Sequence, residues 1–227
     1  MIFDQYDRIR IINLPERTDR RQEMDAELRR FGLSTSDKVA YFPAVRPADA
    51  GVFESVGANG CFQSHFTVLR QALDAGESVL VLEDDCTFRP DIGTFRQRPD
   101  TEIFYGGWGS ASKPDDLVNS DLIGAHFMGF SVPVLRELVP FLHSLLDLRA
   151  QFDPAVVRSN FDPRIRPPID GAYVWFRRYH PQFRTEFEML AGQRPSASDI
   201  AERKWFDKLP GVRTLANRAR RVKQRLT

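Results

Sequence analysis

The sequence predicts an α/β protein in which a mainly parallel sheet is flanked by helices. Short apolar runs alternate along the chain with longer amphipathic stretches, and this alternation favours parallel strands joined by helical crossovers. The run 79–82 is continuously apolar, as expected of a strand covered on both faces. With 227 residues, 42% of them hydrophobic, the chain can build one sizeable domain of this kind.

The expected elements follow one another in order. The first strand is expected over 8–14, where apolar residues alternate and then run together, and Pro15 ends it. A helix over 18–31 follows, because Met24 and Leu28 recur at a spacing of four residues. Further strands are expected at 39–45, 78–82, 103–105 and 123–130. Further helices are expected over 134–148 and 169–178, and another follows residues 57–60 and ends at Ala75.

Composition excludes several classes of protein. Charged residues make up 28% and the net charge is +1, which fits neither general disorder nor a wholly basic nucleic-acid-binding protein. No run approaches the length of a membrane span, and the first residues lack the pattern of a secretory signal. The two cysteines, Cys61 and Cys86, make neither a disulfide framework nor a four-ligand zinc site. We therefore expect a cytoplasmic protein.

The charge is distributed unevenly. Residues 201–227 hold nine Lys/Arg and two Asp/Glu, a balance of +7, whereas 1–200 carry −6. We therefore expect a folded domain over 1–200 and a basic tail over 201–227. Apolar residues at spacings of three and four make 211–226 an amphipathic helix, which either lies on an anionic membrane, such as the inner face of the plasma membrane, or packs on the acidic body or a partner. No aromatic platform accompanies the charge, so we expect no nucleic-acid binding.

Three consecutive acids follow the most apolar strand. Glu83, Asp84 and Asp85 would lie at the carboxyl end of that strand, where open α/β sheets bind ligands. Adjacent like charges repel unless a cation or a donor compensates them, and oxygen ligands favour Mg²⁺ or Mn²⁺. The alternative is an acidic turn that faces solvent.

Two further segments favour an anionic ligand. The first joins the end of the first strand to a helix start, where free N–H groups favour anions, and it holds Asn13, Arg17, Arg20 and Arg21. Guanidinium groups suit phosphate, although Arg20 and Arg21 can equally lie on a solvated helix face. The second segment is 57–65.

In segment 57–65, Gly57 and Gly60 allow a tight turn and a close backbone approach before a helix begins. Ser64 and His65 follow in the first helical turns and can face the same crevice as the acids. The alternative for His65 is a satisfied core histidine, and Cys61 is expected to serve packing.

Together the three segments resemble glycosyltransferase family 25, which comprises bacterial lipooligosaccharide galactosyltransferases and collagen-modifying relatives. The family pattern is I-N-L followed by R-x-x-R-R, then G-x-x-G-C-x-x-S-H, then L-E-D-D. In this chain the first part matches residues 12–14 with Arg17, Arg20 and Arg21, the second matches 57–65, and the third matches 82–85. The match is dense over 8–90, thinner over 120–200 and absent from the tail. Segments 124–131, 168–171 and 193–200 resemble later family motifs, whereas Phe66 stands where the family commonly has arginine.

The resemblance implies a GT-A-like, metal-dependent, inverting hexosyltransferase. Its donor would be a UDP-sugar, with galactose as the expected sugar, its cofactor Mn²⁺ or Mg²⁺, and its acceptor a cell-surface glycan such as lipopolysaccharide or another lipid-linked glycan. By position, the resemblance implies Asp84 and Asp85 as metal ligands and Asn13, Arg17, Arg21, Ser64, His65, Glu83 and Asp84 as donor-binding residues.

An inverting mechanism also needs a base for the acceptor hydroxyl, and Asp170 at an expected helix start is the candidate. Asp170 can instead be the N-cap of that helix, and His126 and His180 are weaker candidates. Two rival functions stay open: a nucleotide-sugar-binding homologue with little transfer, and another nucleotide-dependent transferase. The second would need a Gly/Arg/Lys-rich loop for triphosphate after the first strand, to which residues 13–16 are poorly suited.

Overall fold

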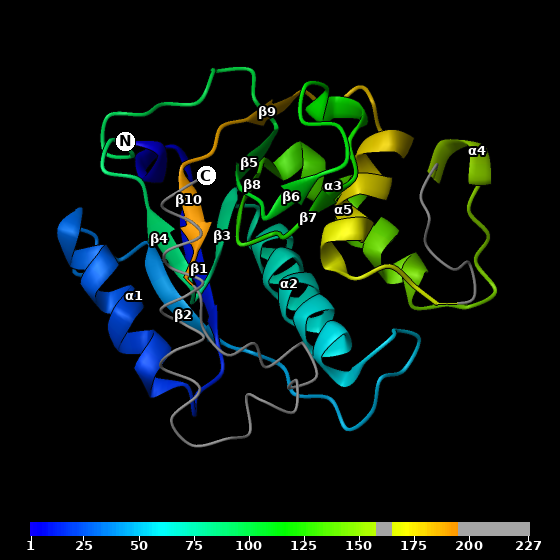
Figure 1. The fold of residues 1–227 in the computed structure, drawn as a ribbon, viewed down its shortest axis with the longest axis horizontal. Helices are drawn as coiled ribbons and strands as arrows, with labels where there is room; N and C mark the ends of the chain where they lie inside the picture. Colours follow the sequence, from blue (N-terminus) through cyan, green and yellow to red (C-terminus); the bar gives the residue numbers. More distant parts are fainter. Residues whose placement is uncertain (158–164, 195–227) are drawn as a thin grey trace.

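A computed structural model describes residues 1–157 and 165–194, and its centre is a six-stranded sheet (Figure 1). The sheet contains, in spatial order, β2 (Val39–Pro43), β1 (Arg8–Asn13), β3 (Val79–Glu83), β8 (Phe127–Phe130), β5 (Ile103–Gly107) and β9 (Thr185–Phe187).

The sheet is mainly parallel. Strand β1 runs parallel to β2 and β3, and β5 runs parallel to β9, whereas β8 is antiparallel to both of its neighbours. The predicted α/β class with a mainly parallel sheet is therefore confirmed. Because β1, β2 and β3 all point the same way, their carboxyl ends share one edge of the sheet.

Helices cover both faces of the sheet (Figure 1). One face packs against α2 (Val56–Ala75), α3 (Val132–Leu145) and α5 (Ile169–Tyr179). The other packs against the short helix η1 (Ile2–Gln5), α1 (Thr18–Arg30) and the paired strands β4 (Cys86–Phe88) and β10 (Ala191–Gln193). The remaining short elements are β6 (Ser110–Ala111), η2 (Leu117–Asn119), β7 (Leu122–Ile123) and α4 (Pro154–Val157).

Strand β3 shows why the sheet needs two helical layers. Val79 and Val81 belong to the core under α2, whereas Leu80 and Leu82 belong to the core under α1, and all four side chains are fully buried. Successive residues of a strand point to opposite faces, so a continuously apolar strand requires cover on both. Each such side chain contributes about 1.5–3 kcal/mol to folding.

Some sequence-based expectations differ from the structure. The single strand expected over 123–130 is two strands in the structure, β7 and β8. The chain turns between them at Gly124, which has a φ of +98°. Strands β4, β6, β9 and β10 were not expected, because runs of two or three residues carry no measurable periodicity. The expected basic helix over 211–226 and the rest of 195–227 lie outside the described residues. Within the described part of the chain, no helix has both the length and the apolar character needed to cross a membrane.

Gly60 provides a test of how the start of α2 packs. A Cβ at this position would lie 2.7 Å from the backbone oxygen of Val45. We expect Gly60→Ala to lower the free energy of unfolding by about 1–2 kcal/mol, because overpacking against immobile backbone exceeds the gain of about 1 kcal/mol in helix propensity.

Urea unfolding followed by circular dichroism measures this difference. Gly192→Ala is the matched control, since nothing lies within 4 Å of a Cβ there. Equal stability of both variants would contradict the close approach of Val45 to α2.

Candidate active site

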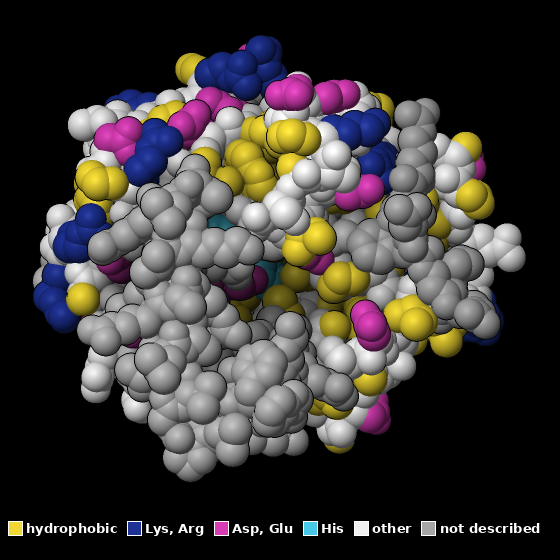
Figure 2. Space-filling model, in the orientation of Figure 1, with side chains coloured by type: hydrophobic (Ala, Val, Ile, Leu, Met, Phe, Trp, Pro, Cys, Tyr) yellow, Lys and Arg dark blue, Asp and Glu magenta, His cyan; other side chains and the backbone are white. Residues whose placement is uncertain are grey.

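A cavity of about 440 Å³ lies at the carboxyl edge of β1 and β3. Figure 2 shows a depression near the middle of the face turned toward the viewer, and histidine and acidic atoms are visible in it. The lining comes from the loop between β2 and α2, the first turns of α2 and the turn after β3. Its polar side chains are those of Arg20, Arg46, Ser64, His65, Glu83, Asp84, Asp85 and Gln193.

Asp84 is fixed by two side chains from the N-terminal part of the chain. Its Oδ2 accepts a hydrogen bond from Asn13 Nδ2 at 2.7 Å, and its Oδ1 accepts one from Arg20 Nη1 at 2.9 Å. Asp84 is 5% exposed and Asn13 is 3% exposed. Both carboxylate oxygens of Asp84 therefore already have donors from the protein. These donors orient the turn formed by Asp84 and Asp85, which we call the acidic turn.

Asp85 is in a different situation. Its Oδ1 is buried and has no hydrogen-bond partner among the described residues, and its Oδ2 lies 3.8 Å from Arg20 Nη1. Burial, together with the charge of Glu83, raises the pKa of Asp85 to about 7. An orphaned carboxylate oxygen that lines a cavity fits a cation ligand. Of the two acids predicted to bind metal, Asp85 has the oxygen available for it.

The last described residues hold the acidic turn from the other side. The backbone N–H of Arg194 donates to the carbonyl oxygen of Asp85 at 2.7 Å, and the Arg194 guanidinium donates to the carbonyl oxygens of Asp84 and Cys86. Gln193 Nε2 donates to Glu83 Oε2 at 3.3 Å. The sequence motif 193–200 predicted no role for these residues; the antiparallel pairing of β10 with β4 brings them to the site.

The structure brings Arg20, rather than Arg17 or Arg21, into the cavity. Arg17 forms a two-pronged ion pair with Asp19, with Nε–Oδ1 and Nη2–Oδ2 distances of 2.9 Å, and Arg21 is exposed, with its guanidinium 4.3 Å from the centre of the Tyr41 ring. Neither lines the cavity.

A sequence signal for Arg20 was present. It precedes the buried residues Met24 and Leu28 at spacings of four, and so shares their face of α1. The donor-binding roles of Arg17 and Arg21 stay predictions.

The expected turn at 57–60 is already helical, because α2 begins at Val56, so Ser64 and His65 lie in the third turn of this helix. Their side chains make different contacts. Ser64 Oγ accepts a hydrogen bond from Val45 N at 2.8 Å and donates one to Gly60 O at 2.6 Å, so it ties the cavity wall to the helix. His65 is fully buried. Its Nδ1 lies 3.0 Å from the Tyr173 hydroxyl, a partner that the sequence pattern did not indicate.

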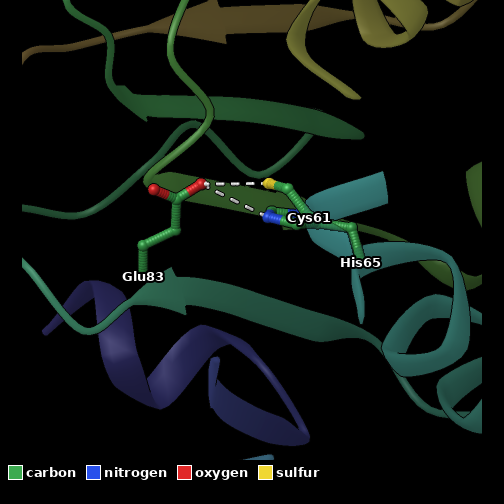
Figure 3. Close-up of side chains that lie close together, drawn as sticks. All are labelled: Cys61, His65 and Glu83. Carbon is green, nitrogen blue, oxygen red and sulfur yellow. Dashed lines mark hydrogen bonds and ion pairs between the residues drawn. The ribbon is translucent and has the colours of Figure 1, made fainter. Parts of the chain in front are cut away.

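Cys61, His65 and Glu83 form a compact cluster at the cavity (Figure 3). Glu83 Oε1 lies 3.4 Å from His65 Nε2 and 4.0 Å from Cys61 Sγ. Burial raises the pKa of the Cys61 thiol. Burial also acts to raise the pKa of Glu83, but His65, His126 and Arg20 together hold that pKa below its usual value.

Asp170 lies in the first turn of α5 and does not line the cavity. Its Oδ2 accepts from Gly124 N at 2.8 Å and its Oδ1 from Gly171 N at 2.9 Å. The helix begins at Ile169 and Pro168 occupies the cap position, so the N-cap alternative is wrong. Burial raises the pKa of Asp170, and Glu83 lies close enough to add to that rise.

The two other histidines considered at the sequence level make structural contacts. His126 is buried, with Nε2 3.0 Å from the carbonyl oxygen of Ala191, and burial lowers its pKa. His180 stacks on Phe176 with ring centres 4.4 Å apart. Neither lines the cavity.

Comparisons with known proteins find a curated relative and a solved structure that are similar to this chain. No family model matches the sequence. The chain is 35% identical over 98 aligned residues to the "Putative glycosyltransferase R655" of Acanthamoeba polyphaga mimivirus, an alignment that covers 37% of this chain and 30% of that protein. The chain thus matches less than a third of the length of this relative.

Among solved structures, the chain is similar to a glycosyltransferase involved in the glycosylation of the major capsid of PBCV-1. The two share 13% sequence identity and superpose with a TM-score of 0.48, over 84% of this chain and 94% of that one.

Replacing Arg20 tests how the acidic turn is compensated. Its side chain is 12% exposed and lies beside Asp84 and Asp85, whose side chains are 7% and 13% exposed. We expect Arg20→Gln to lower the free energy of unfolding by about 3 kcal/mol at neutral pH, since it leaves buried carboxylates without their cation.

The matched control is Arg21→Gln, on the next residue of the same helix, which is exposed and should change stability by less than about 0.5 kcal/mol. Denaturant unfolding measures both variants. Equal losses for the two would contradict the assigned role of Arg20.

Proposed function

We propose that this chain is an inverting glycosyltransferase that moves a hexose from a UDP-sugar to a hydroxyl group of a glycan acceptor. The observation that carries the proposal is the meeting of the acidic turn, Arg20 and the start of α2 around one cavity at the carboxyl edge of the sheet. The likeness to the mimiviral protein supports the same class. The resemblance of the three motifs to family 25 supports galactose as the sugar and lipopolysaccharide as the acceptor.

The chain offers three features that suit the diphosphate of such a donor. The cavity has the volume of an ordinary small-molecule site. Gly57 and Gly60 at the start of α2 border it, where the helix dipole favours negative charge. Arg46 also lines it, and this side chain is 66% exposed in an ion pair with Glu16. Such an exposed pair costs little to exchange for a phosphate.

A divalent ion fits the acidic turn through Asp85. The available oxygen of this side chain is the observation that supports Mn²⁺ or Mg²⁺ here. When bound, such an ion would neutralise charge on the leaving diphosphate. Asn13, Arg20 and Arg194 would hold the turn in position for it, through their contacts with Asp84 and the backbone of Asp85.

Asp170 is the proposed base that takes the proton of the acceptor hydroxyl. Burial raises the pKa of Asp170 toward neutral pH, and a pKa near the working pH suits a general base. The backbone N–H groups of Gly124 and Gly171 orient it. The acceptor would then approach beside the turn between β7 and β8. Residues 211–226, outside the described part, are proposed to attach the enzyme to an anionic membrane carrying the acceptor.

The donor proposal is tested with Asp85→Asn. We expect the wild-type protein to gain thermal stability with UDP-galactose and Mn²⁺ together and to hydrolyse this donor slowly, and the variant to lose both responses while keeping its fold. Differential scanning fluorimetry and release of UDP measure them. Asp74→Asn, at an exposed position of α2, is the control. Unchanged hydrolysis in Asp85→Asn would remove the metal assignment.

The base proposal is tested with Asp170→Asn. Because general-base assistance is worth about 10²–10⁴-fold, transfer to an acceptor hydroxyl should fall by that factor, whereas the affinity for UDP should change little. Isothermal titration with UDP and a transfer assay with a glycan acceptor separate the two effects. Transfer at the wild-type rate would refute the assignment. Donor-dependent stabilisation without transfer in the wild type would instead indicate a nucleotide-sugar-binding protein.

A further inference from the structure

We infer that Cys61, His65 and Glu83 form a second metal site, specific for a zinc-class ion and chemically distinct from the hard-cation site at Asp85. The three donor atoms, Sγ, Nε2 and Oε1, all lie within 4.8 Å of one another. Their side chains converge on one point from α2 and from the end of β3 (Figure 3). This inference does not rest on glycosyl transfer.

The geometry fits ligands around an ion better than a set of hydrogen bonds. His65 is fully buried, yet its Nε2 makes no hydrogen bond among the described residues, although Glu83 Oε1 lies 3.4 Å away. The Cys61 thiol donates to the same oxygen over 4.0 Å, which is the outer limit for a hydrogen bond from sulfur. Ligand atoms around a tetrahedral ion with bonds of roughly 2.0–2.3 Å are separated by distances of this order.

The chain also positions the three ligands. Cys61 and His65 are four residues apart on α2 and therefore lie on the same face of the helix. When Nε2 binds an ion, Nδ1 of His65 would carry the ring proton and donate a hydrogen bond to the Tyr173 hydroxyl, which lies 3.0 Å away. Gln193 holds the second oxygen of Glu83 at 3.3 Å. Such outer contacts orient ligands in known metal sites.

The donor set selects the class of ion. A thiolate, an imidazole and a carboxylate suit Zn²⁺ or Co²⁺, whereas Mg²⁺ and Mn²⁺ prefer oxygen alone. Binding would displace the Sγ proton to solvent. All three ligand residues line the cavity, so a water molecule or a substrate group can take the fourth position.

The test is metal binding by the tag-free full-length protein in the absence of nucleotide. We expect one Zn²⁺ per chain by equilibrium dialysis, retained in excess Mg²⁺, and a sulfur-to-cobalt charge-transfer band with Co²⁺. Cys61→Ser should abolish the band, and Cys86→Ser should keep it, because Cys86 is the other of the two cysteines and its Sγ instead donates to the His126 carbonyl oxygen. Tyr173→Phe should weaken Zn²⁺ binding by about 10-fold.

A measurement on the unaltered protein removes any dependence on how the variants fold. Zn²⁺, but not Mg²⁺, should protect Cys61 from alkylation, as located by mass spectrometry. Absence of Zn²⁺ binding, a cobalt spectrum without the sulfur band, or a band that depends on Cys86 would overturn the inference. Loss of donor hydrolysis in Asp85→Asn leaves it untouched, so the two proposals fail separately.

Discussion

The pairing of Asp84 with Arg20 and Asn13 is the interaction on which the candidate site depends. A buried carboxylate is costly unless it is paired and hydrogen-bonded, and here both of its oxygens have donors from the first strand and the first helix. This pairing fixes a turn of two acids at the end of β3. With Asp84 fixed, Asp85 and Glu83 are held at the cavity, where each contacts different side chains.

The two acids beside Asp84 show how neighbourhood sets chemistry. Burial raises the pKa of Asp85 to about 7, whereas His65 and two other basic side chains hold that of Glu83 below its usual value. One carboxylate thus has an unpartnered oxygen suited to a hard cation, and the other lies among sulfur and nitrogen donors. Two residues apart in sequence, they offer two chemically different environments around one cavity.

The sequence predicted the parts of the site that follow long apolar segments. Strands β1 and β3 are buried runs with clear ends, so their pattern is enough to place Asn13 and the three acids at one edge of the sheet. The choice between Arg20 and the next arginine depended on the spacing of four residues from Arg20 to Met24 and on to Leu28, which places Arg20 on the packed face of α1. The contacts of His65 with Tyr173, and of Asp170 with Gly124, join segments 108 and 46 residues apart. Such pairings depend on tertiary packing and leave no local pattern.

Arg194 has a consequence for how the protein is made. It secures the carbonyl oxygens of the acidic turn from 110 residues further along the chain, and Asn13 secures the same turn from 71 residues before it. A nascent chain that ends before β10 already contains Glu83, Asp84, Asp85 and α1, but it lacks the hydrogen bonds from Arg194. The order of synthesis therefore implies that the acidic turn reaches its final geometry only after β10 has been made and has paired with β4.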